Sequence, residues 1–187
     1  DKLLRRQRYD QYKITREPTP EDFHPQAQRI VEIVGKMGIP ILQAEGYEAD
    51  DILATAARRL AGDDRDVVLV SRDKDLDQLV GPHVVLYDPM KNETLDAAAI
   101  EREKGYPPDK AIEVQTLMGD ATDNIPGVPG VGPKTAAKLI AKYGSAEAVL
   151  AHADEQTPKL RENLQAVGAE GLKLSRDLVT LDRDVPM

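Results

Sequence analysis

The first hundred residues alternate between helical and extended hydrophobic patterns. Apolar residues at helical spacing predict one helix over about residues 20–37 and another beginning near Ala49. Short apolar runs at 39–42, 66–70 and 84–87 predict strands. A strand, a helix and a second strand in succession indicate a right-handed crossover, so we expect an α/β fold with a parallel central sheet flanked by helices. The stripe predicted to be buried on the first helix comprises Phe23, Ala27, Ile30, Val31 and Val34.

From about residue 95 to the end, the hydrophobic pattern is helical. Helices are predicted at about 95–104 and 109–118, from Pro133 onward, and in short pieces at 145–152 and 158–166. We therefore expect two regions. An α/β region at 1–100 begins with a basic segment at 1–17, and a helical region follows at 101–187.

The composition indicates a globular chain whose metal ligands, if any, are oxygen atoms. Of its 187 residues, 41% are hydrophobic and 31% are charged, and none is cysteine, which excludes disulfides and thiolate metal sites. The three histidines are scattered without the spacing of a zinc site. Oxygen ligands favour Mg²⁺ or Mn²⁺. No run has the length of a membrane span and no signal peptide is visible, so we expect a cytoplasmic protein without membrane contact.

Charge is distributed unevenly along the chain. The net charge is −8, yet residues 1–16 hold six basic residues against two acidic ones. Tyr9 and Tyr12 lie in this segment, and with Arg5 and Lys13 they recur near helical spacing. Aromatic rings that stack on bases and cations that contact phosphates would grip a single nucleic-acid strand. A solvated helix face is the alternative interpretation.

Acidic residues form three groups after separate elements. The first lies between the predicted strand at 39–42 and the next helix, the second follows the strand at 66–70, and the third lies in a polar turn. Sites in parallel sheets lie beyond the carboxyl ends of the strands, which places the first two groups at one edge. Each group alone is more simply interpreted as helix capping or a solvated surface. The groups are Glu48, Asp50 and Asp51; Asp73 and Asp75; and Asp120 and Asp123.

Carboxylates gathered at one edge of a sheet require cations to remain ionised. Seven clustered negative charges drive protonation unless cations lie between them. Two divalent ions about 4 Å apart would activate a water molecule and stabilise the leaving oxygen of an in-line phosphoryl displacement. The pattern therefore indicates metal-assisted phosphodiester chemistry, which requires no nucleophilic serine or cysteine.

A glycine-rich loop, GVPGVG at 127–132, runs into a helix that opens at Pro133. Glycines expose backbone N–H groups, and those groups together with the helix N-terminus attract phosphate. The stretch departs from a P-loop because Pro133 separates the last glycine from Lys134. A plain interhelical turn is the alternative. Lys134 and Lys138 lie one helical turn apart and therefore share a face.

Three blocks of sequence carry a family resemblance. GYEADD at 46–51, SRDKDLDQL at 71–79 and MGDATDNIPGVPGVGPKTAAKLI at 118–140 resemble, in order and spacing, the 5′-nuclease family of bacterial DNA polymerase I exonuclease domains and flap endonucleases. The resemblance implies a PIN-like α/β fold followed by a helix-hairpin-helix DNA-binding region. It also implies a metal-dependent 5′→3′ exonuclease or flap endonuclease that hydrolyses DNA in replication and repair. The alternative is a structure-specific DNA-binding fragment without efficient catalysis.

The resemblance implies roles for individual residues. Tyr12-Lys13-x-x-Arg16 resembles the family's helical-arch segment, which engages the single-stranded 5′ end and the scissile phosphate. The metal-site acids, holding two Mg²⁺ or Mn²⁺ ions, are then Glu48, Asp50, Asp51, Asp73, Asp75, Asp120 and Asp123. The catalytic residues are Lys13, Arg16, Glu48, Asp50, Asp73, Asp75 and Asp120. With the basic segment included, the expected DNA contacts are Arg5, Tyr9, Tyr12, Lys13, Arg16, Gly127, Gly130, Gly132, Lys134, Thr135 and Lys138.

The resemblance also implies partners and one departure. The expected substrate is DNA with a 5′ flap, a nick or a branch, in the nucleoid, with K⁺ bound at the hairpin and a polymerase region beyond the C-terminus. The family opens with a strand that bears one metal-site aspartate, and a second aspartate lies just upstream of the arch segment. Neither segment is recognisable in this chain, so we expect an N-terminally truncated domain whose sheet lacks its first strand.

Overall fold

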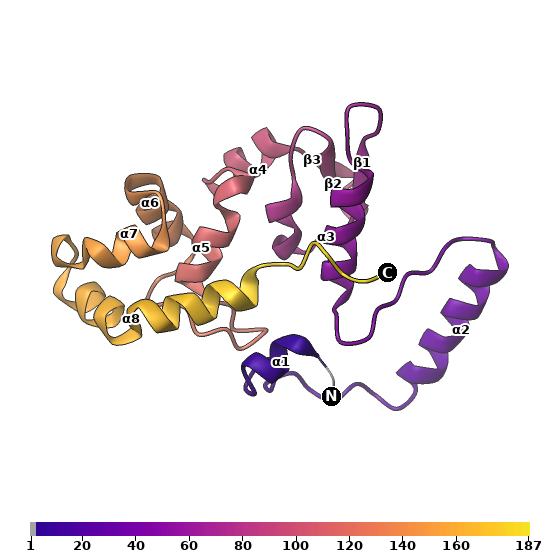
Figure 1. The fold of residues 1–187 in the computed structure, drawn as a ribbon, viewed down its shortest axis with the longest axis horizontal. Helices are drawn as coiled ribbons and strands as arrows, with labels where there is room; N and C mark the ends of the chain where they lie inside the picture. The colour runs from indigo at the N-terminus through magenta and orange to yellow at the C-terminus, as the bar shows by residue number, and fades with distance from the viewer. Residues whose placement is uncertain (1–2) are drawn as a thin grey trace.

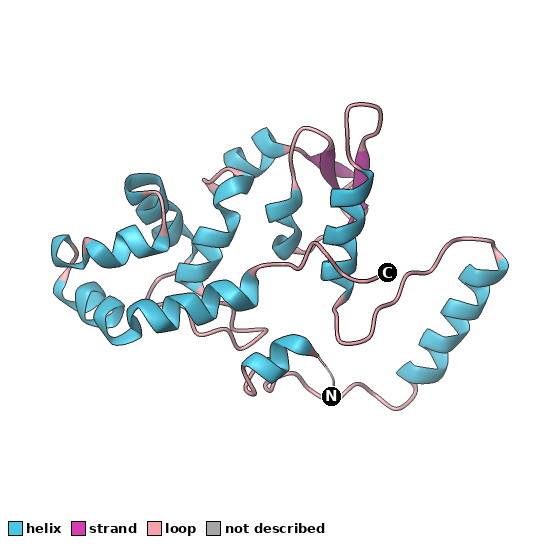
Figure 2. Cartoon of the chain, in the orientation of Figure 1, coloured by secondary structure: helices cyan, strands magenta, loops and turns pink. Residues whose placement is uncertain are grey.

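A computed structural model describes residues 3–187 of the chain. The first two residues of the predicted basic segment, Asp1 and Lys2, lie outside the described part. Helices dominate the molecule, and the strands are confined to one small sheet (Figure 2). The first three helices are α1 (Leu4–Arg8), α2 (Phe23–Lys36) and α3 (Ala49–Leu60). None of the helices described is long and apolar enough to cross a lipid bilayer.

The sheet is mixed rather than parallel throughout. β1 (Val67–Val70) pairs in parallel with β2 (Val84–Asp88), with Val67 opposite Val84, and β2 pairs antiparallel with β3 (Glu93–Leu95). The parallel pairing expected for the strands at 66–70 and 84–87 therefore holds for β1 and β2, but the short β3 turns back directly through a tight connection. A connection this short can join only antiparallel strands.

The prediction of a strand at 39–42 is wrong. The segment is irregular and pairs with no described strand, and its apolar side chains are about half exposed. A strand needs a hydrogen-bonded neighbour, and within the described residues β1 is paired with β2 alone. The first acidic group therefore follows a loop rather than a strand.

The apolar stripe of α2 is also misplaced in the prediction. The helix forms where expected, but none of its residues is buried, and Phe23, Ile30 and Val31 are exposed. In Figure 1, α2 stands apart from the rest of the chain. Helical periodicity depends on local sequence alone, whereas burial requires a second surface, and the chain on either side of α2 runs away without covering it.

The second half of the chain is helical, and its helices pack mainly on one another. After α4 (Ala97–Lys104) comes a single turn of 3-10 helix, Pro108–Lys110, which leads into α5 (Ala111–Met118). Then follow α6 (Pro133–Tyr143), α7 (Ala146–Ala151), a second 3-10 turn at Ala153–Glu155, and α8 (Pro158–Val179). The helix predicted at 158–166 is much longer, because α8 continues through a kink at Gly168, whose φ is 61°.

One hydrophobic core runs through both predicted regions. It includes Leu69 and Leu86 of the sheet and Leu117, Ile140 and Leu164 of the helical half. A smaller cluster joins Tyr12 to Ile125, Leu178 and Val179. The end of the chain, beyond α8, crosses over α3 (Figure 1), where the Thr55 hydroxyl accepts a hydrogen bond from the Val185 N–H. The division into regions 1–100 and 101–187 remains a prediction.

Candidate active site

The three acidic groups meet at one open cleft of about 580 Å³. The cleft lies where α3 begins, where the chain leaves β1, and at the turn that follows α5. Five of the seven predicted metal-site acids line it: Asp50, Asp73, Asp75, Asp120 and Asp123. Four basic side chains line it as well: Lys13, Arg16, Arg72 and Lys74. Glu48 and Asp51 adjoin the cleft through other contacts.

Local hydrogen bonds fix the acids of the first group. Glu48 is the N-cap of α3, and it forms a capping box in which the Glu48 side chain accepts from the Asp51 N–H and the Asp51 side chain accepts from the Glu48 N–H. Asp50 lies in the first turn of α3, where the helix dipole favours negative charge. Glu48 and Asp51 are therefore confirmed as helix-capping residues, which does not by itself decide whether they also bind metal.

Short turns orient the other two groups. Asp73 caps the 3-10 helix Lys74–Leu79, with its Oδ1 accepting from the Asp75 N–H at 3.0 Å. Asp120 Oδ1 accepts from the backbone N–H groups of Thr122, at 2.7 Å, and Asp123, at 3.3 Å. Both turns end with carboxylates that face the same cleft.

Basic residues pair with the acids across the cleft. Lys13 pairs with Glu48 and lies 3.5 Å from Asp123, and Arg16 donates to Asp123 at 2.6 Å. Lys74 pairs with Asp120. The basic segment and the acidic groups, which are far apart in sequence, therefore form one site.

The carboxyl groups of the cleft differ in proton affinity. Burial, followed by the charge of Asp73, raises the pKa of Asp75 to about 6. Burial also raises the pKa of Asp50, again with a contribution from Asp73. Burial opposes ionisation of Asp120 too, but hydrogen bonds from Lys74 and the backbone hold the pKa of Asp120 below its ordinary value. Asp50 and Asp75 are thus the acids that lack sufficient positive charge nearby.

The seven-acid metal cluster is not assembled as predicted. Within residues 3–187, no three acidic or histidine side chains converge on a common metal position. Two of the carboxylates are instead turned toward Lys74 and Arg16. The donor set still fits a hard divalent cation, because the cleft offers only oxygen ligands, and burial together with the charge of Asp73 disfavours the ionised forms of Asp50 and Asp75.

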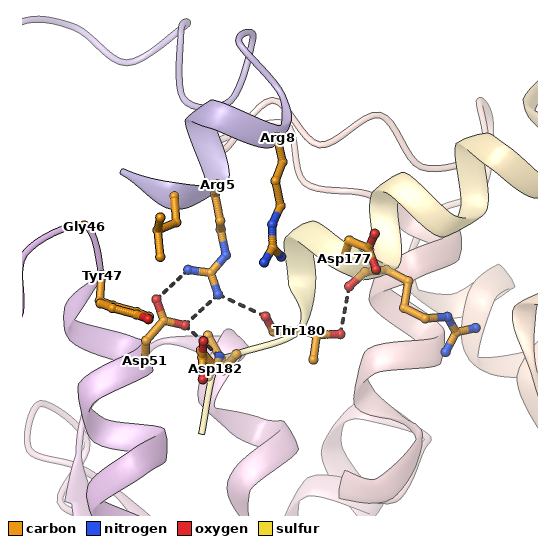
Figure 3. Close-up of a pocket in the computed structure, with 11 residues that line it drawn as sticks. Arg5, Arg8, Gly46, Tyr47, Asp51, Asp177, Thr180 and Asp182 are labelled. Atoms are coloured by element: carbon orange, nitrogen blue, oxygen red, sulfur yellow. Dashed lines mark hydrogen bonds and ion pairs between the residues drawn. The ribbon is translucent and has the colours of Figure 1, made fainter. Parts of the chain in front are cut away.

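Arg5 was expected to contact DNA, but its side chain is buried. Figure 3 shows its guanidinium between the start of α3 and the end of α8. It donates two hydrogen bonds of 2.6 Å to Asp51, one to Glu48, and one each to the carbonyl oxygens of Leu178 and Thr180 at 3.0 Å. All five N–H donors of the guanidinium are thereby used. We call this arrangement the Arg5 clasp, and it leaves no donor for a DNA phosphate.

The clasp also changes the assignment of Asp51. Both carboxylate oxygens accept from Arg5, and the backbone N–H of Asp182 donates to one of them at 2.8 Å. Asp51 is 1% exposed. A carboxylate occupied on both oxygens and removed from the cleft is a poor metal ligand, so we remove Asp51 from the predicted set.

The tyrosines of the basic segment pack inside the protein rather than facing solvent. Tyr12 is 3% exposed, and its hydroxyl donates to Glu48 at 2.9 Å and lies 3.2 Å from Asp123. Tyr9 packs partly buried against the same small cluster. The helical spacing predicted for the segment ends early, because α1 stops at Arg8 and Lys13 has a φ of 57°. Of the basic segment, Lys13 and Arg16 remain at the cleft.

The glycine-rich loop divides into a buried and an exposed part. Gly127 is buried, its N–H lies 3.3 Å from the Ser175 hydroxyl, and a Cβ at Gly127 would lie 2.3 Å from the Gly119 nitrogen. It therefore allows two backbone segments to touch and is wrongly predicted as a DNA contact. The remaining predicted contacts are exposed: Gly130, Gly132, Lys134, Thr135 and Lys138.

Three polar residues at the site escaped the sequence analysis: Arg72, Lys74 and Gln115. Lys74, inside the SRDKDLDQL block, pairs with Asp120, and its place between two predicted site acids could have identified it. Gln115, on α5, donates to Asp75 at 2.6 Å. A single glutamine within a helix carries no such signal.

Comparison with known proteins covers the whole chain. Residues 1–105 match the family model described as "5'-3' exonuclease, N-terminal resolvase-like domain", and residues 106–187 match "5'-3' exonuclease, C-terminal SAM fold". The chain is 44% identical over 187 residues to DNA polymerase I of Rhizobium leguminosarum, covering 100% of this chain and 18% of that protein. It is 40% identical over 184 residues to the thermostable DNA polymerase I of Thermus thermophilus, covering 98% of this chain and 22% of that protein. The chain thus spans about a fifth of the length of these relatives.

The fold is shared with a viral enzyme. The flap endonuclease of bacteriophage T5, solved in complex with DNA and metal ions, aligns with a TM-score of 0.79 at 23% identity. The alignment covers 97% of this chain and 71% of that one. At this level of identity the similarity shows the fold.

Proposed function

Because the chain belongs to the 5′-3′ exonuclease family, we propose that it is the part of a DNA polymerase I that hydrolyses DNA phosphodiester bonds, as a 5′→3′ exonuclease and flap endonuclease. The observation that carries the proposal is the cleft, in which Lys13 and Arg16 of the basic segment face five carboxylates. Cations beside carboxylates allow a phosphate to approach a site that would otherwise repel it.

Asp50, Asp73, Asp75, Asp120 and Asp123 would hold the divalent cations, two Mg²⁺ or Mn²⁺ ions. Such ions, when bound, lower the pKa of a water molecule and stabilise the oxygen that leaves. The chain's own residues supply the rest. Lys13 and Arg16 bind the phosphate at the rim, and Lys74 holds Asp120 ionised.

The exposed part of the glycine-rich loop would bind duplex DNA as a helix-hairpin-helix. α6 begins at Pro133 without a side-chain cap, so the N–H groups of Lys134 and Thr135 remain available to a phosphate oxygen. Lys134 and Lys138 extend the positive surface along α6. A K⁺ ion at the loop would complete the same contact, and the nucleoid of the cytoplasm is where this substrate is found.

A second candidate is a structure-specific DNA-binding region that cleaves inefficiently. The observation in its favour is the pairing of carboxylates with Lys13, Arg16 and Lys74, which a metal ion would have to displace. The two candidates differ in whether hydrolysis follows binding.

The experiment uses a 5′-flap duplex labelled at its 5′ end. We expect the chain to cleave it in Mg²⁺, to lose cleavage in EDTA, and to retain flap binding in EDTA. Asp73→Asn should lower the single-turnover rate at least about 100-fold, since it removes a charged metal ligand. Asp64→Asn, which changes an exposed carboxylate outside the cleft, is the control and should leave the rate unchanged. Binding without metal-dependent hydrolysis would favour the second candidate, and absence of both would contradict the proposed function.

A further inference from the structure

Gln115 makes a polar contact with a site acid from within the helical core. It lies on α5 and is 3% exposed. Its side-chain Nε2 donates to Asp75 Oδ1 at 2.6 Å. The hydrogen bond joins the sequence matched by the C-terminal family model to an acid in the sequence matched by the N-terminal one.

The other end of the same amide is unsatisfied. Gln115 Oε1 is buried, and within residues 3–187 it has no hydrogen-bond partner. A buried acceptor without a donor destabilises the folded state, whereas an apolar side chain of similar shape avoids that cost. Stability alone therefore does not account for a glutamine at this position, and its single satisfied contact is with Asp75.

Asp75 has few other restraints on its carboxylate. Lys74 is 3.9 Å from Oδ1, which is too long for a strong pair, and Asp75 Oδ2 has no hydrogen-bond partner in the described part of the chain. A neutral amide can fix Oδ1 without adding a positive charge that would compete with a bound cation. Hydrogen bonds of this kind orient metal-ligating carboxylates in proteins.

We propose that Gln115 is a positioning residue that holds Asp75 so that its free oxygen Oδ2 is available to a divalent cation. The proposal rests on the proposed function, because it assumes that Asp75 is a metal ligand. It assigns to α5 a part in the active site as well as in the core.

The test substitutes Gln115→Met, which keeps the length of the side chain and removes both the donor and the unsatisfied acceptor. We expect Mn²⁺ affinity, measured by calorimetry on the full chain, to fall about 10-fold or more. We also expect the Tm of the metal-free variant to equal or exceed that of the original chain. A residue with only a structural role would not lower metal affinity while preserving stability.

The matched control is Thr116→Val, on the next residue of α5. Thr116 is also fully buried, and its hydroxyl only donates to the Ile112 carbonyl of its own helix. We expect its Mn²⁺ isotherm to be unchanged. If Gln115→Met does not fold, Gln115→Leu supplies the same loss of the amide.

The outcomes separate the two levels of the proposal. Unchanged Mn²⁺ affinity in a folded Gln115 variant overturns the positioning role. The proposed function stands in that case, provided that the original chain binds Mn²⁺. A weaker isotherm accompanied by a lower Tm also overturns it, because Gln115 would then act through stability. Failure of the original chain to bind Mn²⁺ overturns both.

Discussion

Arg5 is the residue whose role differs most between sequence and structure. Its side chain and that of Asp51 are almost removed from solvent, with 10% and 2% of their surfaces exposed. An ion pair this deeply buried stabilises little relative to apolar residues, but removing one partner leaves an uncompensated charge. The clasp is therefore sensitive to loss of either residue.

We expect Arg5→Met to lower the free energy of unfolding by about 3–5 kcal/mol, because Asp51 remains buried without a counter-ion. Arg5→Lys should not restore stability, since one ammonium group cannot replace five planar N–H donors. Urea unfolding of the metal-free chain measures both. Arg58→Met, which removes an exposed pair with Asp184, is the control and should cost less than about 1 kcal/mol. Equal losses of unfolding free energy in Arg5→Met and Arg58→Met would show that the Arg5 clasp stabilises the fold no more than an exposed ion pair does.

At the residue scale, the sequence identified which acidic residues share a site better than it identified the contacts of individual side chains. Asp50, Asp73, Asp75, Asp120 and Asp123 were predicted as a group and line one cleft. Arg5 and Tyr12 were predicted to contact DNA, but both are buried. A basic or aromatic residue gives the same sequence signal whether its side chain faces solvent or a buried carboxylate. The contacts that decide are long-range: Arg5 meets Asp51 and the end of α8, and the Tyr12 hydroxyl meets Glu48 and Asp123.

At the scale of elements, α5 is joined to α7 and α8 by an ion-pair network. Glu113 on α5 accepts from Arg176 of α8 and, at 2.8 Å, from the Ala146 N–H at the start of α7. Burial alone would raise the pKa of Glu113, but these hydrogen bonds outweigh it and lower the pKa below its ordinary value of 4.5. Glu113 therefore ties together three helices while it is ionised.

This network predicts acid sensitivity. The folded chain holds Glu113 ionised to lower pH than the unfolded chain does, so its contribution is present above about pH 4.5 and is lost as the pH falls through the lower folded value. We expect Glu113→Gln to cost about 1–3 kcal/mol at pH 7 and to differ less from the original chain at pH 3. Glu147→Gln, which alters the exposed partner of the same Arg176, should change the pH profile little. Urea titrations at several pH values compare them, and a cost of Glu113→Gln that does not depend on pH would contradict the network.

Elements with strong local signals were predicted well. α3 begins at Ala49 as expected, and the two parallel strands lie within one residue of their predicted bounds. The strand expected at 39–42 and the buried face of α2 were wrong, because both depend on partners that local sequence does not specify. The sheet is mixed because of β3, which the sequence analysis did not predict. Three residues are too few to show the alternating pattern of a strand.

At the scale of the whole molecule, the cleft and the exposed side of α6 are separate surfaces. One offers five carboxylates beside four basic side chains, and the other offers lysines and backbone N–H groups. DNA that reaches both would be held along its duplex and cut at its end. Binding and cleavage should therefore respond differently to substitutions on the two surfaces.

We expect Lys134→Ala to weaken duplex binding evenly across sequences and to flatten the slope of log affinity against log salt by about one unit. The reason is the loss of one phosphate contact without any base contact. Fluorescence anisotropy over a range of KCl concentrations measures the slope. Lys173→Ala, which removes an exposed lysine paired with Asp177 on α8, should leave the slope unchanged. A loss confined to particular base sequences would mean that the loop reads bases.

The Arg5 clasp has a further consequence for the order in which the molecule is made. Arg5 emerges among the first residues of this stretch during synthesis, yet two of its acceptors are the carbonyl oxygens of Leu178 and Thr180, more than 170 residues later. Until those residues leave the ribosome, the backbone groups that enclose the Arg5 guanidinium and the Asp51 carboxylate are absent. The Arg5 side chain that donates to Glu48 is then not yet held in place. Contacts so distant in sequence form late and slowly. A nascent chain would therefore carry an incomplete acidic group after α3 has emerged and complete it only when the last turn of α8 is released.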